Sequence, residues 1–330
     1  MMFSAGEKHR TGPEIANLLK RRLTTPPVTR FAPAPTGALH LGHVVNALYV
    51  WGLARALDGR VLLRIEDHDR QRSRREAEQS MLDDLDWLGL TPDMYPTSAY
   101  RHGTSDGRQS ERDEIYRHAL APLIAAGLVY GCRCTRTQLS ENAADSGDGQ
   151  TSTERRYPGT CRHERIALED GVGWRLVIEP EEEAFDDAML GPQVQDPGAQ
   201  CGDLLLRDRL GNWTYQCVAT IDDMVQGVTL VVRGQDLLAS TGRQIRLARL
   251  LGRKVPAVFA HHPLVMKSET QKLSKSDGDS GIGDLRSQGW SASDVLGHAA
   301  AIAGLMPARA PLDARDLGRL FTSPSDATST

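Results

Sequence analysis

Aromatic residues are scarce in this chain, since Phe, Trp and Tyr make up only 5% of its 330 residues. Long apolar runs are absent as well, because no stretch reaches the roughly 18 apolar residues that a membrane-spanning helix needs. The N-terminal residues lack the apolar core and the small-residue cleavage site of a secretory signal. With 40% hydrophobic and 25% charged residues, the chain is expected to be a soluble, cytoplasmic, globular protein without a membrane partner.

Cysteine is also rare, and neither sign of charge dominates. Five cysteines, an odd number, argue against a disulfide framework. Cys132 and Cys134 stand at C-x-C spacing, which keeps metal ligation open, whereas Cys201 and Cys217 flank expected strands and are expected in the core. The net charge of -4 excludes a strongly basic, nucleic-acid-binding composition. Any RNA partner must therefore be held by a local patch.

The alternation of apolar and turn-forming residues predicts an α/β fold. Residues 1–28 are polar and basic apart from one short amphipathic stretch, and we expect them to form a peripheral extension. The chain then reads as a strand (VTRFA), a Pro/Gly turn, a helix over about 41–57 and a second strand (VLLRI). This order is a βαβ unit.

Two further helices are expected after this unit, over about 74–88 and 110–126, and Ser110 or Asp113 is expected to cap the second. A strand-like VYGCRC follows. The stretch 142–153 contains no large apolar residue, so it cannot bury itself and is expected to form a mobile loop insertion.

The C-terminal half first departs from this alternation and then returns to it. WRLVIEP and LLLRDRLGNWTYQCVAT read as antiparallel strands, the latter as a pair with its turn at Gly211 and Asn212. VTLVVRG, a helix over about 237–251 and VPAVFAHHPLVM then restore the α/β order. The tail over 307–330 is poor in large apolar residues and is expected to fray.

The segment PAPTGALHLGH, residues 33–43, lies between the first strand and its helix, where α/β sheets bind nucleotides. Free backbone N–H groups and the helix dipole favour phosphate there, and His40 and His43 lie on one helix face and can donate to phosphoryl oxygens. Gly42 leaves room for a base or ribose against the backbone. The alternative is a proline-rich turn with two incidental surface histidines.

A second motif, KLSKS at residues 272–276, follows a strand and precedes a glycine-rich stretch. Lys272 and Lys275 flank Ser274, and two lysines in a short loop can stabilise the charge that develops on a triphosphate during displacement at its α-phosphorus. Taken alone, this segment is more often a solvated basic loop. Together with the upstream histidine turn it is a rare combination.

These two motifs, with RIEDHD, DDLDWLGL and VVRGQDLLASTGRQ, resemble the glutamyl branch of the class I aminoacyl-tRNA synthetases from about Thr29 to Ser276. The resemblance implies a Rossmann-like parallel-sheet catalytic core in two halves, 29–128 and 201–276. An inserted zinc-binding subdomain at 129–200 and a short helical region with a tail at 277–330 complete the expected organisation. The resemblance also implies catalytic roles for His40, His43 and Lys275, and Mg²⁺ that accompanies ATP. The ATP contacts that it implies come from Pro33, Thr36, Gly37, Gly42, Lys272, Ser274 and Lys275.

Glutamate offers two carboxylates and an ammonium, so its site needs guanidinium groups and at least one acid. Arg30 and Arg233 stand at expected strand ends, Glu66 can take the ammonium, and Tyr215 adds a hydroxyl. In the resembling family the matched positions contact glutamate. Surface charges at strand ends are the alternative. The same resemblance adds Phe31, Ala32, Pro33 and Ala34, and Ala34 stands where the family usually has serine, so a hydroxyl is missing from the expected pocket.

Four acidic residues near these positions can be mistaken for magnesium ligands, but helix-cap and turn roles are the favoured expectation. They are Asp67, Asp69, Asp222 and Asp223.

A third group of residues predicts a structural metal site. Cys132, Cys134 and Cys161 supply three thiolates, which suit the tetrahedral shell of Zn²⁺. Tyr157 is expected as the fourth ligand only because shortened glutamyl-type synthetases show C-x-C followed by Y-x-x-x-C at this insertion. His163 is the chemically plainer rival, and a reduced cysteine cluster without a metal is the alternative.

Too little chain is expected beyond Ser276 for the helical anticodon-binding domains of full glutamyl-tRNA synthetases. The chain therefore resembles the glutamyl-Q tRNA(Asp) synthetase family, which implies activation of glutamate and its transfer to queuosine in the anticodon loop of tRNA(Asp), by a monomer. A modified base in a single-stranded loop is a feature that proteins read by stacking and edge contacts. The alternatives are a truncated glutamyl-tRNA synthetase that charges a tRNA 3′ end, an H-x-G-H nucleotidylyltransferase, and a non-catalytic RNA-binding paralogue.

Overall fold

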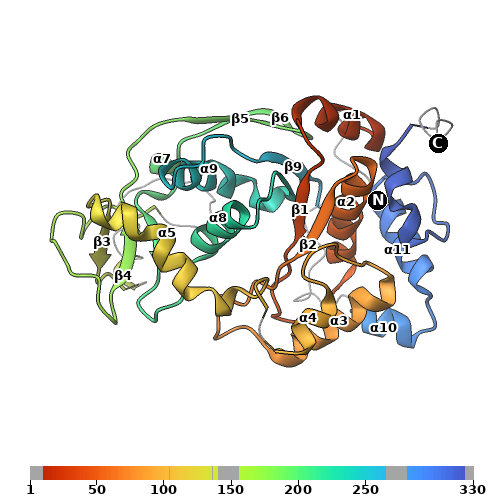
Figure 1. The fold of residues 1–330 in the computed structure, drawn as a ribbon, viewed down its shortest axis with the longest axis horizontal. Coiled ribbons are helices and arrows are strands. Elements are labelled where there is room, and N and C mark those ends of the chain that lie inside the picture. The colour runs from red at the N-terminus through yellow and green to blue at the C-terminus, as the bar shows by residue number, and fades with distance from the viewer. Residues whose placement is uncertain (1–9, 104, 136, 140–155, 265–280, 324–330) are drawn as a thin grey trace.

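A parallel sheet forms the centre of the molecule in the computed structural model, which describes residues 10–103, 105–135, 137–139, 156–264 and 281–323. Strand β1 (Val28–Phe31) pairs in parallel with β2 (Arg60–Leu63), and β8 (Leu230–Gly234) pairs in parallel with β9 (Val258–His262). The two pairs meet where the Thr229 amide donates to the Val28 carbonyl at 2.9 Å. Helix α2 (Leu41–Ala56) connects β1 to β2, so the predicted βαβ unit is confirmed (Figure 1).

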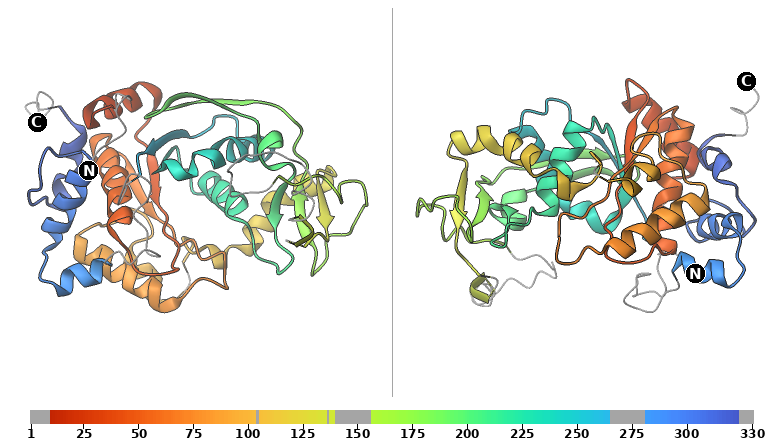
Figure 2. Two further views of the ribbon diagram at one scale, coloured as in Figure 1. Left: turned by 180° about the vertical axis from the view of Figure 1, so that it is seen from behind. Right: turned by 60° about the horizontal axis from the view of Figure 1, so that its bottom comes forward.

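Helix α2 has apolar residues on nearly all of its sides, which fits a helix that other elements cover on nearly all sides. One side faces the sheet, and the other packs against α11 (Ala292–Ile302) and the 3-10 helix η4 (Ala314–Phe321). Gly52 permits this approach, since a Cβ there would lie 2.3 Å from the Phe321 ring. Figure 2 shows this C-terminal region lying along the same side of the molecule as α1 and α2.

Two expectations about the ends of the chain were wrong for the residues that the structure describes. The tail does not fray over η4, because Leu317 and Phe321 are fully buried. Helix α1 (Gly12–Arg22), within the expected peripheral extension, buries Ile15 and Leu19 in the main core and lies against η4. A few large apolar side chains at helical spacing were enough to bury each segment.

The segment after β2 contains α3 (Arg75–Leu88), α4 (Thr97–Arg101), the 3-10 turn η1 (Gln109–Glu111) and α5 (Asp113–Ala125). Helices α3 and α5 confirm the two expected helices. The expected cap of α5 was wrong, because Arg112 occupies the N-cap position. The Ser110 hydroxyl instead donates to Asp67 at 2.5 Å, and Asp113 accepts from Trp213.

The part of the chain between α5 and α8 contains two small antiparallel sheets. One has the order β3 (Val129–Cys132), β4 (Gly173–Leu176), β7 (Leu204–Arg207), and the other is the β5 (Glu183–Asp187) and β6 (Gly191–Gln195) hairpin, followed by α7 (Pro197–Cys201). Figure 1 shows β3 and β4 at one end of the molecule and α1 and α11 at the other. The β5 hairpin reaches back to the parallel sheet, where the Ala188 amide donates to the Phe259 carbonyl at 2.8 Å.

One expected strand is a helix. Residues Tyr215–Val225 form α8, so the predicted hairpin is cut short to a bridge between Arg207 and Trp213 and a few backbone hydrogen bonds around it. The alternating letters of TYQCVAT suggested a strand, but the longer run places Cys217, Val218 and Ile221 on one buried helical face. The tertiary core therefore overrides the local β-propensity.

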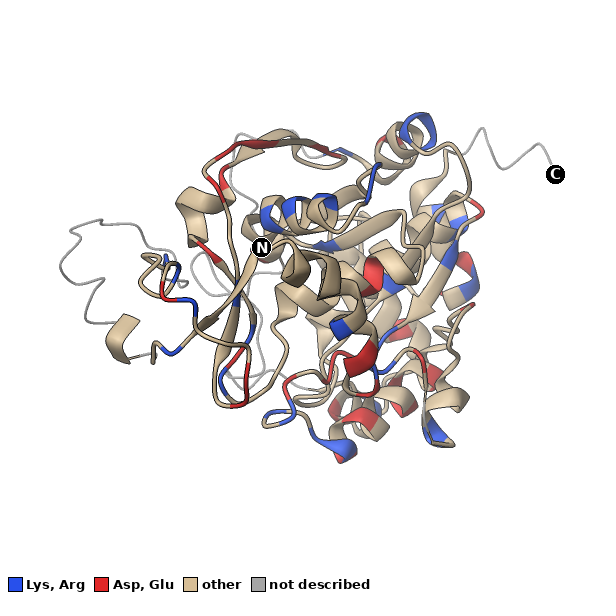
Figure 3. Ribbon diagram, turned by 60° about the vertical axis from the view of Figure 1, so that its left-hand side comes forward, with Lys and Arg blue, Asp and Glu red and all other residues tan. Residues whose placement is uncertain are grey.

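The remaining elements follow the prediction with shifted bounds. The expected helix over 237–251 divides into the 3-10 helix η2 (Gln235–Ser240) and α9 (Thr241–Leu250), and α10 (Ile282–Ser287) precedes α11. The predicted loop at 142–153 lies outside the described residues, and the domain boundaries stay a prediction. None of the helices in the described part of the chain has the length and apolar character that a membrane crossing requires. Figure 3 shows acidic and basic residues mixed along the ribbon, in keeping with the small net charge.

Candidate active site

The histidine turn lies where β1 ends and α2 begins. His40 is the N-cap of α2, and its Nδ1 accepts from the Gly42 amide at 3.1 Å. The Nδ1 atom of His43 accepts from the His40 amide at 3.2 Å, and the two ring centroids are 4.0 Å apart. Because both Nδ1 atoms accept, each neutral ring carries its proton on Nε2. The two histidines thus present Nε2–H donors at the positive end of a helix, where phosphate binds favourably.

The chain on both sides of the lysine motif meets this turn. His40 forms an isolated bridge with Gly281, and the Ile282 amide donates to the Leu39 carbonyl at 2.9 Å. On the other side, His262 at the end of β9 lies 3.1 Å from the Asn46 side chain of α2. Lys272, Ser274 and Lys275 themselves lie outside the described residues. The described residues before the lysine motif therefore lie beside α2, and those after it lie beside His40.

Backbone hydrogen bonds hold the end of β1 against the end of β2. The Arg64 amide donates to the Phe31 carbonyl at 2.9 Å, and the Glu66 amide donates to the Pro33 carbonyl at 3.0 Å. Pro33 is buried, whereas Ala34 is exposed. The segment with Ala32, Thr36 and Gly37 thus lies at the carboxyl ends of parallel strands, the edge at which open α/β sheets bind ligands.

Arg30 and Glu66 are joined through a buried network of charges. The Arg30 Nε donates to Asp223 Oδ1 at 3.3 Å, and Arg64 donates to the same oxygen at 2.7 Å and to Glu66 Oε1 at 3.2 Å. Burial raises the pKa of Asp223, but Arg64 and Arg30 outweigh it and hold that pKa below its usual range. Burial lowers the pKa of Arg64, but Asp223 and Glu66 outweigh it and raise the pKa above its usual value. The arginine is charged in this site.

The four acidic residues have different roles, and the cap or turn expectation was right only for Asp69, which accepts from the amides of Gln71 and Arg72. Asp222 is instead a buried acceptor for Arg112 at 2.7 Å. Asp223 belongs to the arginine network described above, and Asp67 binds Ser110. Buried carboxylates need such partners, which a linear sequence does not reveal.

Arg233 at the end of β8 is buried, and each of its three guanidinium nitrogens has a protein partner. Its Nη1 donates to Gln244 Oε1 at 2.7 Å and to the Tyr215 hydroxyl at 3.2 Å, and its Nη2 donates to Thr241 Oγ1 at 2.8 Å. Its Nε donates to His261 Nε2 at 3.0 Å. The structure therefore brings Arg233 and Tyr215 together, although Tyr215 begins a helix rather than lying on a strand.

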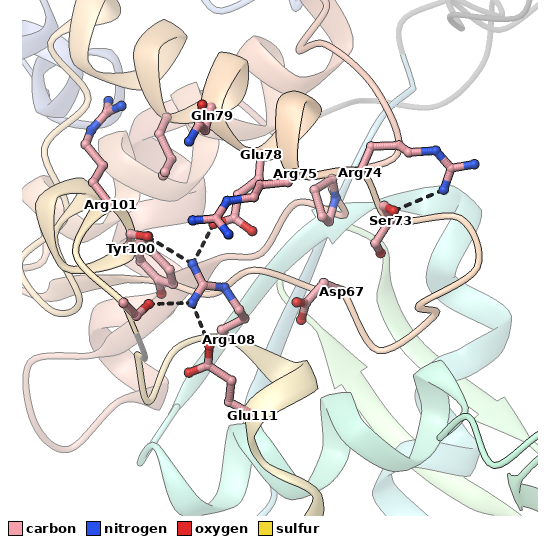
Figure 4. A pocket seen from close by; sticks show the side chains of 13 residues that line it. Asp67, Ser73, Arg74, Arg75, Glu78, Gln79, Tyr100, Arg101, Arg108 and Glu111 are labelled. Carbon is pink, nitrogen blue, oxygen red and sulfur yellow. Dashed lines mark hydrogen bonds and ion pairs between the residues drawn. The ribbon is translucent and has the colours of Figure 1, made fainter.

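Two cavities open beside these residues. One, of about 380 Å³, is lined by Pro35 and Asp67 from the ends of β1 and β2 and by Arg108, which pairs with Glu78 and Glu111 (Figure 4). The other, of about 340 Å³, is lined by three arginines and one acid, against four arginines and three acids in the first. Its lining includes His68, Arg70, Gln109, Asp113, Arg117, Arg207 and Trp213.

The second cavity carries aromatic and guanidinium groups side by side. The Arg207 guanidinium lies 5.4 Å from the ring centroids of both Trp174 and Trp213. Asp113 is the one acidic residue among those that line this cavity, and it accepts from Arg117 and Trp213 at 2.6 Å each. The cavity adjoins Tyr215, since the His68 ring lies 6.5 Å from that of Tyr215.

The cysteine cluster forms at the far end of the insertion. Sγ atoms of Cys132, Cys134 and Cys161 lie within 4.8 Å of one another. Cys134 and Cys161 are 3.6 Å apart, close to the roughly 3.8 Å that two sulfurs keep at 2.3 Å from a tetrahedral zinc. The Tyr157 hydroxyl lies 3.4 Å from Cys132 Sγ, whereas His163 is exposed and outside the group. The geometry and the donor atoms suit Zn²⁺.

Residues 27–296 match the family model described as tRNA synthetases class I (E and Q), catalytic domain. The chain belongs to this family. Glutamyl-Q tRNA(Asp) synthetase of Symbiobacterium thermophilum is 44% identical over 299 residues, which is 88% of this chain and 91% of that protein. The protein of the same name from Nitratidesulfovibrio vulgaris is 38% identical over 307 residues, 90% of this chain and 93% of that one. The predicted resemblance to the glutamyl branch and its glutamyl-Q members is thus confirmed.

A solved glutamate tRNA ligase from Elizabethkingia meningosepticum, in complex with its amino acid, superimposes with a TM-score of 0.72 at 25% identity. The match covers 90% of this chain and 64% of that one, so the chain spans just under two-thirds of that structure's length. The predicted α/β catalytic fold of the class I type is confirmed.

Several buried residues of this site were not predicted from the sequence, namely Arg64, Asp187, His261, Thr241 and Gln244. A signal existed for two of them, because Arg64 and His261 interrupt apolar strands (VLLRIE and VFAHHP). A charged or polar residue on a buried strand requires a partner, and that requirement points to a network.

Proposed function

We propose that this chain activates glutamate with ATP and transfers it to queuosine in the anticodon loop of tRNA(Asp). The observation that carries the proposal is the match along about nine-tenths of the chain to relatives of that name. The geometry of the histidine turn and of the arginine-rich strand ends supports the first step. A cytoplasmic monomer fits this role.

In the first step a carboxylate oxygen of glutamate attacks the α-phosphorus of ATP. A bond forms between that oxygen and the α-phosphorus, the bond from the α-phosphorus to the α,β-bridging oxygen breaks, and pyrophosphate leaves with that oxygen. His40 and His43 donate Nε2–H groups to phosphoryl oxygens, and Lys275 with Lys272 and Ser274 stabilises charge on the leaving side, with Mg²⁺ accompanying the nucleotide. Pro33, Thr36, Gly37 and Gly42 shape the nucleotide side of the turn. The protein positions groups and stabilises charge.

The glutamate side of the site uses groups of opposite charge at neighbouring strand ends. Arg30 and Arg233 receive the substrate carboxylate, Glu66 receives the ammonium, and Tyr215 adds a hydroxyl that already contacts Arg233. The backbone of Phe31, Ala32, Pro33 and Ala34 borders this space, and Ala34 offers no hydroxyl to the substrate.

The acceptor is proposed to enter through the second cavity, beside the residues proposed to bind glutamate. Arg70, Arg117 and Arg207 offer guanidinium groups to phosphates, and Trp213 offers an indole within the same 340 Å³ space. Single-stranded RNA is recognised by this combination of charge and stacking. The step then joins the glutamyl carbonyl to a queuosine hydroxyl, breaks the acyl–phosphate bond and releases AMP.

Cys132, Cys134, Tyr157 and Cys161 are proposed to hold Zn²⁺. The cluster lies in the antiparallel insertion, where Cys132 ends β3, and not beside the histidine turn. A metal there would cross-link the insertion and take no part in the chemistry.

The test is to incubate the protein with ATP, labelled glutamate and purified tRNA(Asp) with and without queuosine. We expect label only on the queuosine-containing tRNA, and periodate oxidation of the 3′ ribose should not abolish it when queuosine is protected. Label at the 3′ end of either tRNA would instead establish a glutamyl-tRNA synthetase. Glutamate-independent pyrophosphate exchange would indicate a nucleotidylyltransferase.

A further inference from the structure

A buried series of three hydrogen-bonded side chains runs from the β5 hairpin to the residues proposed to bind glutamate. Asp187 at the end of β5 lies 2.6 Å from His261 Nδ1, and His261 Nε2 accepts from Arg233 Nε at 3.0 Å. Asp187 and His261 are fully buried, and Arg233 nearly so. The series thus connects a carboxylate, an imidazole and a guanidinium on three adjacent strands, β5, β9 and β8.

The hydrogen bonds fix where the imidazole proton lies. Asp187 is an acceptor, so Nδ1 must donate, and Arg233 is a permanent donor, so Nε2 must accept. The other carboxylate oxygen of Asp187 accepts from the amides of Met189 and Leu190 at 2.9 Å each, which holds the carboxylate in place. His261 is therefore neutral, with its proton on Nδ1.

The same contacts fix the plane of the Arg233 guanidinium. His261 holds Nε, Gln244 and Tyr215 hold Nη1, and Thr241 holds Nη2 at 2.8 Å. Thr241 Oγ1 also lies 3.1 Å from His261 Nε2, so the hydroxyl and the ring support the arginine together. These contacts use four of the five guanidinium N–H groups, so the remaining Nη2–H is held in one direction. A charge-assisted hydrogen bond to a carboxylate depends on such a fixed direction.

We propose that His261 and Asp187 are positioning residues that orient Arg233 for the substrate carboxylate. This inference rests on the proposed function, in which Arg233 binds glutamate. Neither residue touches substrate in this account. The same arrangement of a buried carboxylate behind a histidine is the usual means by which proteins fix a ring's tautomer and direction.

The arrangement has a direct consequence for pH. Protonation of His261 would place an N–H group against the Arg233 Nε–H, so two donors and two positive charges would face each other. The charged groups around the ring are Asp187 from β5, Arg233 from β8 and Arg30 from β1, with Thr241 from α9 and Phe259 stacked beside it. Burial lowers the pKa of His261 below its ordinary value despite the Asp187 hydrogen bond. Glutamate affinity should therefore fall only in moderately acidic solution.

The experiment measures glutamate-dependent pyrophosphate exchange across a pH series for the wild type, His261→Ala, His261→Gln and Asp187→Asn. We expect His261→Ala and Asp187→Asn to raise the KM for glutamate about 10- to 100-fold, the effect typical of removing a supporting residue, with the KM for ATP unchanged. His261→Gln keeps a neutral acceptor, so it should recover part of the affinity and remove the acid limb of the glutamate KM profile. His118→Gln, an exposed histidine on α5, is the control.

The outcomes separate this inference from the proposed function. If Arg233→Lys leaves the glutamate KM unchanged, the glutamate site itself is misplaced. If Arg233→Lys raises that KM while the folded His261→Gln and His261→Ala proteins match the wild type, only the positioning role is overturned. Persistence of the acid limb in His261→Gln also contradicts it. Thermal unfolding of each variant identifies loss of fold as the cause of any effect on both substrates.

Discussion

Replacing Asp223 tests the buried charge network most severely. This carboxylate is the shared acceptor of Arg30 at 3.3 Å and Arg64 at 2.7 Å, and the Arg64 side chain is fully buried. Without Asp223, Glu66 at 3.2 Å from Arg64 is the ion-pair partner that remains to these two guanidiniums among the described residues. Removing one partner from a buried ion pair costs about 3–5 kcal/mol, because the other charge stays buried and uncompensated. Against a total stability of about 5–15 kcal/mol, Asp223→Ala should be strongly destabilised.

A conservative variant separates the effect of losing the charge of Asp223 from the effect of losing the whole side chain. Asp223→Asn keeps one carbonyl acceptor for Arg64 and loses the charge, so we expect a loss of about 1.5–3 kcal/mol, the value of a hydrogen bond to a charged group. Asp83→Asn is the matched control, since its pair with Arg101 is largely exposed and should contribute about 0–1 kcal/mol.

The assay is urea-induced unfolding followed by circular dichroism, with the midpoint compared at equal slope. The pKa of Asp223 is lowered in the folded state, so its contribution is present above its unfolded pKa of about 3.9 and is lost as the pH falls through the folded value. The wild-type advantage over Asp223→Asn should therefore shrink in acid. If Asp223→Ala unfolds at the same midpoint as Asp83→Asn, the network does not stabilise the fold and this reasoning is wrong.

Three further predictions concern the active site and the insertion. Lys275→Ala should lower kcat for adenylate formation about 100- to 1,000-fold, as loss of a transition-state donor does, with little change in glutamate binding; equal effects on both would refute its role. Purified protein should contain one zinc ion per chain, and Cys161→Ser should release it while pyrophosphate exchange is retained; metal analysis without zinc removes the site. Arg70→Ala should reduce the salt dependence of tRNA binding by about one unit of slope, whereas Arg60→Ala, at the opposite end of β2, should not.

The parallel core could be predicted from the sequence because its signals are local. The βαβ unit has apolar strands, a Pro/Gly turn and a helix in sequence order, and β1, α2 and β2 formed within one to two residues of expectation. The cysteine cluster was also predictable, since Cys132 and Cys134 are neighbours and few residue types ligate zinc.

The misassigned elements share a physical cause, namely that their conformation depends on distant partners. Tyr215–Val225 has strand-like letters but is helical because one face packs into the core around Cys217. Leu317 and Phe321 look like isolated apolar residues until α2 supplies the surface that they cover. The same holds for Asp187 and His261, which are 74 positions apart and meet only in the folded sheet.

The most direct test of the whole account is a crystal structure with a non-hydrolysable glutamyl-adenylate analogue. The account predicts the phosphate within hydrogen-bonding distance of the Nε2 atoms of His40 and His43, and the glutamyl carboxylate beside Arg30 and Arg233. An analogue bound away from the turn between β1 and α2, or turned so that its carboxylate meets neither arginine, would contradict it.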